Sequence, residues 1–122
     1  MADTTNRLAG IAYLAVDGVT YLLSGDLAYR VARVERTTLI GQDRVHGYSE
    51  KPMSGMISAT IRDAGVLSVA SLSAMTNVTL TLELANGKII VGRNMWLIEH
   101  PEVKTEDGTI DVKWEGISVE EV

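Results

Sequence analysis

Residues 78–84 alternate apolar and polar side chains without interruption, a period of two that is typical of a strand with one buried face. Asn86-Gly87 follows. This pair favours a two-residue type I′ hairpin turn, because both central residues of that turn need positive φ. Folding the chain about the turn predicts a returning strand with two apolar pairs on one face: Leu84 with Ile89, and Leu82 with Val91.

A second turn is predicted at Asp107-Gly108. Its register puts apolar residues on one face and opposite charges on the other, in four cross-strand pairs: Val103 with Val112, Thr105 with Ile110, Lys104 with Asp111, and Glu102 with Lys113. Pro101 is expected to divide this part of the sheet into a strand over 94–99 and one over 102–105. Because the registers about both turns bring apolar side chains together on one face, the second half of the chain is predicted to be an antiparallel sheet.

The first half also begins with a predicted hairpin, over 11–16 and 19–23 about Asp17-Gly18. Its expected pairs are Val16 with Val19, Leu14 with Tyr21, and Ala12 with Leu23. Residues 24–26 are expected to form a loop, and 27–36 a strand. Neither face of that strand is cleanly apolar, which is typical of a strand at an edge or an interface.

Residues 37–52 have no convincing period, and a connection of this length inside a small domain is usually functional or disordered. The segment is too apolar for a disordered linker. Two interpretations stay open with equal weight: a projecting loop or long hairpin that docks on another subunit, and a plain ordered loop.

A further strand is predicted over 56–62, followed by Asp63 as an N-cap and one helix over 66–75. Residues 1–7 are expected to form an arm, and 117–122 a short strand or arm. The fold class is therefore mainly β, an antiparallel sandwich or partly closed barrel with one flanking α-helix, in a single domain over 1–122.

The charge is distributed unevenly along the chain. The net charge is −5; residues 1–76 carry seven basic and seven acidic side chains, and residues 77–122 carry four basic against nine acidic. An acidic C-terminal sheet argues against a nucleic-acid-binding surface there, since phosphate affinity comes from Lys and Arg. No apolar run approaches the ~20 residues that a membrane span needs, so no membrane insertion is expected.

The sequence offers no catalytic constellation, and no cofactor is expected. Cysteine is absent, so there is no thiolate chemistry. His46 and His100 are far apart and lack ligand spacing, so no metal site is predicted. Trp96 and Trp114 could stack a ligand, although a role as core anchors is favoured.

Several stretches, in order along nearly the full chain, resemble the tail tube proteins of Mu-like contractile-tailed phages. They include Ala15-Val16-Asp17-Gly18-Val19, His46-Gly47-Tyr48-Ser49-Glu50 and Leu84-Ala85-Asn86-Gly87-Lys88. The remaining similarity lies at 7–10, 20–21, 41–43, 45, 51–52, 59–63, 80–83, 93–96, 102–103, 106–109 and 114–116. No single motif is diagnostic, but their shared order is specific.

The resemblance implies a structural subunit of hexameric rings that stack into a hollow tube for DNA passage. Implied partners are further copies of the chain, the tail sheath, the tape measure, and baseplate or terminator proteins. The implied location is the virion tail, after assembly in the host cytoplasm. The segment 37–52 would reach the next ring, with contact residues Leu39, Ile40, Gln42, Asp43, Arg44, Val45, His46, Tyr48, Glu50 and Lys51.

Two further sets of residues follow from the same implication. Arg7 and Leu8 would belong to an arm that seals contacts between subunits, as would 117–122. An acidic channel would keep DNA from adhering to the wall. Its candidate residues are Glu83, Glu99, Glu102, Asp111 and Glu115.

The alternative to a tube subunit is a small-molecule or peptide-binding β-domain with Trp96, Trp114 or Tyr48 at a pocket.

Overall fold

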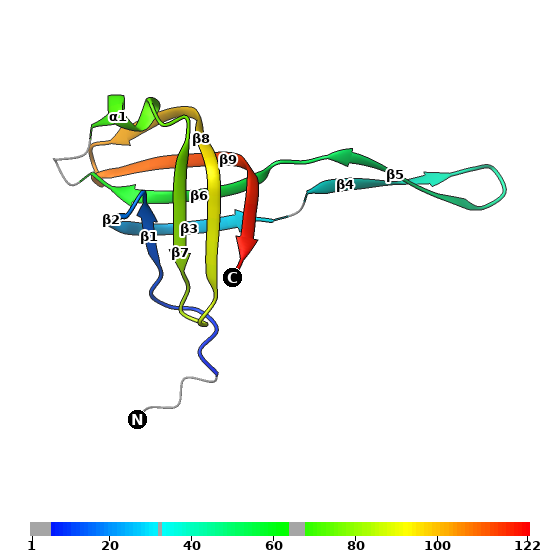
Figure 1. The fold of residues 1–122 in the computed structure, drawn as a ribbon, viewed down its shortest axis with the longest axis horizontal. Helices are drawn as coiled ribbons and strands as arrows, with labels where there is room; N and C mark the ends of the chain where they lie inside the picture. Colours follow the sequence, from blue (N-terminus) through cyan, green and yellow to red (C-terminus); the bar gives the residue numbers. More distant parts are fainter. Residues whose placement is uncertain (1–5, 32, 64–67) are drawn as a thin grey trace.

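The computed structural model describes residues 6–31, 33–63 and 68–122 (Figure 1). Seven strands form one antiparallel sheet in the order β2-β1-β7-β8-β9-β6-β3. They are β1 (Tyr13–Val16), β2 (Val19–Tyr21), β3 (Leu23–Arg30), β6 (Gly55–Arg62), β7 (Val78–Glu83), β8 (Ile89–Lys104) and β9 (Thr109–Glu121).

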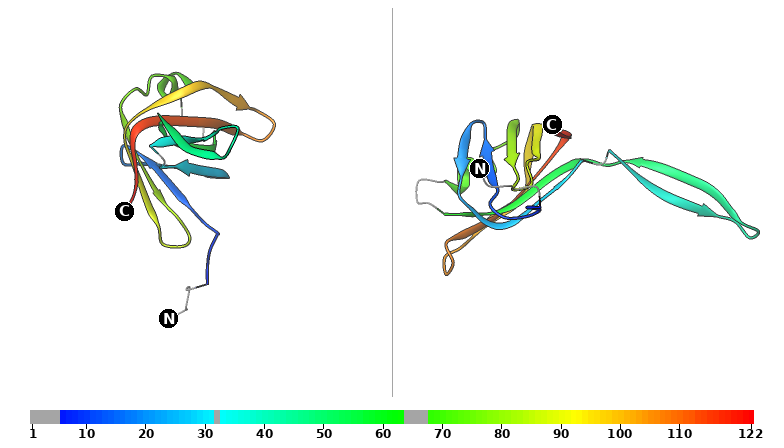
Figure 2. Two further views of the ribbon diagram at one scale, coloured as in Figure 1. Left: turned by 90° about the vertical axis from the view of Figure 1, so that its right-hand side faces the viewer. Right: turned by 90° about the horizontal axis from the view of Figure 1, so that it is seen from below.

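This sheet closes almost completely on itself. β8 and β9 are long and curved, so each contributes to two halves of the sheet whose strands cross (Figures 1 and 2). The two edge strands, β2 and β3, follow one another in the chain with only Leu22 between them. The fold is therefore a partly closed barrel, and the predicted fold class is confirmed.

The core is built from the alternating residues that the period of two predicts. Every second residue of β6 is buried, and so is every second residue of β7. The largest fully buried side chains are Trp114, Leu14, Ile57, Ile61, Leu72, Leu80, Leu82, Ile90, Met95 and Ile110. Leu72 comes from the short helix α1 (Val69–Ser73), which lies over one end of the barrel (Figure 1).

The curvature of β8 and β9 depends on close packing around Met95. Gly92 and Gly116 both lie against this residue, and a Cβ on Gly116 would come within 2.8 Å of Met95 Cγ. Asn94 has a φ of 54°, and β8 gains a residue relative to β7 between Gly92 and Met95, which is a β-bulge. The bulge and the missing side chains let the two strands bend from one half of the sheet into the other.

The hairpin predicted at Asn86-Gly87 is present, but its register is wrong by one residue. Leu82 lies opposite Ile90 instead of Val91, and Glu83 lies opposite Ile89. The turn is longer than two residues: Leu84 N–H donates to the Lys88 carbonyl at 2.9 Å, and Gly87 N–H donates to the Leu84 carbonyl at 3.0 Å.

The strand register predicted about the second turn, Asp107-Gly108, is wrong by two residues. Val103 lies opposite Ile110 and Glu102 opposite Asp111, because the loop takes up residues 105–108. A shift of two keeps every side chain on its predicted face. The expected ion pair between Lys104 and Asp111 therefore forms, at 3.0 Å, across a diagonal of the ladder.

The Asp17-Gly18 hairpin is confirmed for the Val16–Val19 and Leu14–Tyr21 pairs. The predicted Ala12–Leu23 pair is wrong, because Leu23 starts β3 and pairs with Ile61 of β6. The strand expected over 27–36 is also wrong. β3 already begins at Leu23, includes the predicted loop at 24–26 as an irregular stretch, and ends at Arg30.

The single predicted helix is present but shorter, since α1 spans Val69–Ser73. Its N-cap is Ser68, whose hydroxyl accepts from Ser71 N–H at 3.3 Å, so the prediction of Asp63 as N-cap is wrong. Residues 66 and 67 of the predicted helix lie outside the described part of the chain. Pro101 was predicted to divide the strand; β8 instead runs through it, although the pairing with β9 is interrupted there and skips from Ile98 to Glu102.

Candidate assembly surfaces

Residues 34–52 form a two-stranded hairpin that projects far from the barrel, β4 (Val34–Ile40) and β5 (Val45–Pro52) (Figures 1 and 2). Every residue of both strands is exposed. Of the two interpretations left open for 37–52, the plain ordered loop is therefore wrong, and the segment is a long hairpin. The segment has no apolar period because neither face of the hairpin packs on the core.

The two faces of this hairpin differ in chemistry. Pairing puts apolar side chains on one face, namely Val34, Pro52, Tyr48, Ile40 and Val45. The Arg36 guanidinium on the same face lies 5.6 Å from the Tyr48 ring centre and pairs with Glu50 at 3.2 Å. The other face carries Glu35 with Lys51, Thr37 with Ser49, and Leu39 with Gly47. We call the first of these the apolar face of the hairpin.

The tip of the hairpin has a defined structure. Gly41 N–H donates to the Arg44 carbonyl at 2.9 Å, and His46 Nε2 lies 3.0 Å from Asp43 Oδ1. The hydrogen bond with His46 lowers the pKa of Asp43 below its ordinary value. Any side chain at Gly41 would overlap the His46 ring. These contacts close the tip of the hairpin in a defined turn.

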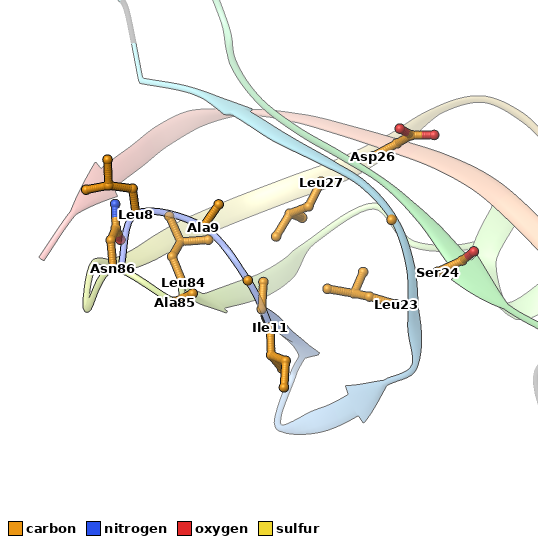
Figure 3. A pocket seen from close by; sticks show the side chains of 13 residues that line it. Leu8, Ala9, Ile11, Leu23, Ser24, Asp26, Leu27, Leu84, Ala85 and Asn86 are labelled. Carbon is orange, nitrogen blue, oxygen red and sulfur yellow. The ribbon is translucent and has the colours of Figure 1, made fainter. Parts of the chain in front are cut away.

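A groove of about 490 Å³ follows the seam between β3 and the segment that leads into β1 (Figure 3). Its larger apolar side chains are Leu8, Ile11, Leu23, Leu27 and Leu84. Arg7 Nε donates to the Ala85 carbonyl at 2.8 Å, which holds the described part of the N-terminal arm against the β7–β8 turn. Residues 1–5 of the predicted arm lie outside the described part.

Four of the five candidate channel carboxylates lie on one surface of the barrel. Glu102 and Asp111 face each other across β8 and β9, and Glu115 follows on the same face of β9. Glu99 and Asp111 line a shallow groove of about 290 Å³. Glu83 is separate: it lies on β7, opposite Tyr13 and Ile89, in the other half of the sheet.

Comparison with known proteins now decides the family. The family model described as phage tail tube protein matches residues 5–121. The chain is also similar to a Mu-like prophage FluMu tail tube protein of Haemophilus influenzae, with 28% identity over 116 residues, 95% of this chain and 97% of that protein. The chain belongs to the phage tail tube family. The resemblance noted in the sequence is thereby confirmed.

As a member of the tail tube family, the protein is a structural component of a virion tail that assembles with other tail proteins. This assignment gives the exposed hairpin a context, because a subunit of a tube must present surfaces to its neighbours.

The pocket residues of the alternative interpretation do not lie together in this tail tube protein. Trp114 is completely buried in the core, and Tyr48 lies on the projecting hairpin. Trp96 lines a shallow open groove at the base of the hairpin with Met53 and Ile117. Within residues 6–31, 33–63 and 68–122, no group of three His, Asp or Glu could hold a metal ion, and no helix is long and apolar enough to cross a membrane.

One residue of the shallow acidic groove was missed from the sequence. Asp26 joins Glu99 and Asp111 in the shallow groove, although residues 24–26 were predicted as a loop. Of the two alternatives for 117–122, the strand is confirmed for 117–121, which form the end of β9 and pair with β8 through contacts such as Gly92 with Val119. The tail of the chain is further held by Lys88, which pairs with Glu121 at 2.9 Å; this hydrogen bond lowers the pKa of Glu121.

Proposed function

We propose that this tail tube protein forms hexameric rings that stack into a hollow tube, through which DNA passes into the host without specific binding. The observation that carries the proposal is the hairpin of β4 and β5, which is exposed along its whole length and apolar on one face. A two-stranded hairpin is at best marginally stable in water by itself. Docking on the next ring would bury the apolar face and stabilise it.

The edges of the sheet supply a second contact. β2 and β3 lie at the two ends of the strand order, and an open edge can pair with another chain. In the proposed ring, identical neighbours complete these edges, and the N-terminal arm with Arg7 and Leu8 seals the contact. Assembly then draws its free energy from strand pairing and apolar burial, with no bond made or broken.

The lumen would be lined by the surface that carries Glu99, Glu102 and Asp111. Like charge keeps DNA from adhering to a channel wall. The tube would sit within a contractile sheath, around a tape measure and between baseplate and terminator proteins, after assembly in the host cytoplasm.

Electron microscopy of the purified protein tests the proposal. Samples over a range of concentration and salt should contain rings and filaments of stacked rings, and light scattering should give the mass of many copies. Particles that stay monomeric under all conditions would contradict self-assembly. They would favour the alternative, a binding β-domain that uses the groove beside Trp96.

A further inference from the structure

The base of the hairpin is held by two arginines of the chain that enters it. Arg30, the last residue of β3, donates from Nε to the Ser54 carbonyl at 3.1 Å and from Nη2 to the Ser54 hydroxyl at 3.3 Å. The same guanidinium lies 3.7 Å from Glu115 of β9. One side chain therefore joins the strand that enters the hairpin, the chain that leaves it, and the barrel.

The second arginine, Arg33, lies nearer the hairpin and also pairs with a carboxylate of β9. Arg33 Nη2 lies 3.3 Å from Glu120 Oε1, and Glu120 also lies 3.8 Å from Arg93 of β8. Met53 N–H donates to the Arg33 carbonyl at 2.9 Å. Glu115 and Glu120 thus anchor the entering chain at two separate points of β9.

Hydrophobic packing reaches the chain that enters the hairpin, where Val31 is partly buried against the core, but it does not extend along the hairpin itself. The fully buried apolar side chains among the described residues come from the barrel and α1, while β4 and β5 are exposed throughout. We propose that the Arg30–Glu115 and Arg33–Glu120 pairs set the direction in which the hairpin leaves the barrel, and so act as positioning residues for its docking on another copy. The docking part rests on the proposed function; the control of direction does not.

The two pairs differ in exposure. The Arg30 and Glu115 side chains are 35% and 27% exposed, against 69% and 47% for Arg33 and Glu120. Exposed ion pairs are weakened by salt more than partly buried ones. Salt should therefore weaken the Arg33–Glu120 pair before the Arg30–Glu115 pair. Glu115, engaged by Arg30, is accordingly a structural carboxylate rather than a free charge of the channel.

The absence of cysteine allows a direct measurement. Cysteines introduced as Gln42→Cys at the tip and Glu106→Cys in the β8–β9 loop can carry nitroxide labels, and pulsed electron paramagnetic resonance gives their distance distribution in unassembled protein. The Arg30→Ala/Arg33→Ala variant should broaden the distribution at least twofold. Arg36→Ala, which removes an arginine within the hairpin, is the matched control and should leave the width unchanged.

An equally narrow distribution in the Arg30→Ala/Arg33→Ala variant, with cooperative thermal unfolding retained, would overturn the proposal. Should that variant fail to fold, Arg30→Lys and Glu120→Gln replace it. Lysine keeps the charge but not the fork that reaches Ser54, so it should still broaden the distribution. If the wild-type protein forms no tubes, the proposed function fails while the distance measurement still decides the role of the arginines. If tubes form, the double variant should give rings with fewer or shorter stacks.

Discussion

Leu82 lies opposite Ile90 across β7 and β8, and this pairing decides which isoleucine enters the core. Ile90 is completely buried, whereas its neighbour Ile89 is 40% exposed. With the register of a two-residue turn, Ile89 would have taken the inner face. A slip of one residue exchanges the two faces of a strand.

The first prediction compares these two neighbours. Ile90→Ala should lower the free energy of unfolding by about 2–5 kcal/mol, because it removes buried methyl groups and leaves a cavity. Ile89→Ala, the matched control, should cost less than about 1 kcal/mol, since its side chain is already partly in water. Urea denaturation of unassembled protein measures both. Equal costs would contradict the register of β7 and β8.

Sequence patterns predicted the strands better than their partners. Alternation identifies which residues of a strand share a face, and this held for β6 and β7. It does not count the residues in a turn. Asn86-Gly87 and Asp107-Gly108 were both located correctly, but each turn takes up more residues than two, because positive φ at Gly87 and Gly108 suits longer loops as well.

The assembly surfaces were predictable in part. The length and composition of 37–52 marked the segment as unusual, yet its apolar face appears only once Thr38 is paired with Tyr48 and Ile40 with Val45. The anchoring arginines gave only an indirect signal: a strand over 27–36 without a clean apolar face. Their partners, Glu115 and Glu120, are far away in the sequence, and the pairing of β6 with both β3 and β9 brings Glu115 level with Arg30.

A second prediction concerns the bend itself. Gly116→Ala should destabilise the protein by about 1–3 kcal/mol, the usual cost of overpacking, because its Cβ would come within 2.8 Å of Met95 Cγ. The same substitution should cost less in a Met95→Ala background, which lacks that atom. A double-mutant cycle in urea measures the coupling. Strictly additive costs would show that a Cβ at position 116 makes no steric contact with the Met95 side chain.

A third prediction separates the two faces of the hairpin. Ile40→Ser/Tyr48→Ser should leave the barrel folded but shorten or abolish stacks, because the apolar face can no longer be buried on a neighbour. Leu39→Ser is the matched control on the opposite face and should stack normally. Electron microscopy gives the filament lengths, and circular dichroism gives the melting temperatures. Filaments of normal length from the double variant would argue against docking through this face.

The fourth prediction concerns pH. The Thr60 hydroxyl, which donates to Asp111 at 2.8 Å, and the Lys104 ammonium both lower the pKa of Asp111 below its ordinary value of about 3.9. A carboxylate whose pKa is lower in the folded state stabilises the protein above its unfolded pKa. That contribution is lost as the pH falls through the folded value. Acid should therefore destabilise the wild type more than Asp111→Asn.

Thr60→Val provides the site-specific readout for this effect. Removing the hydroxyl should raise the pKa of Asp111, followed by carboxyl carbon chemical shifts in an NMR titration of unassembled protein. An Asp111 titration that is the same with and without Thr60 would show that the hydrogen bond does not act on this carboxylate.

The last prediction addresses which surface faces the channel. Glu99 and Glu102 lie on the surface that is proposed to line it, whereas Glu83 lies in the other half of the sheet. Tubes of Glu99→Lys/Glu102→Lys protein should retain a fluorescent double-stranded oligonucleotide inside, because cationic side chains attract phosphate. Retention should weaken steeply with salt. Tubes of Glu83→Lys should bind the oligonucleotide no better inside the channel than wild-type tubes do.

Since an oligonucleotide could also adhere to the outside of a tube, protection from nuclease distinguishes the two locations. Protection by the Glu83→Lys tubes alone would reverse the assignment and place the other half of the sheet at the lumen.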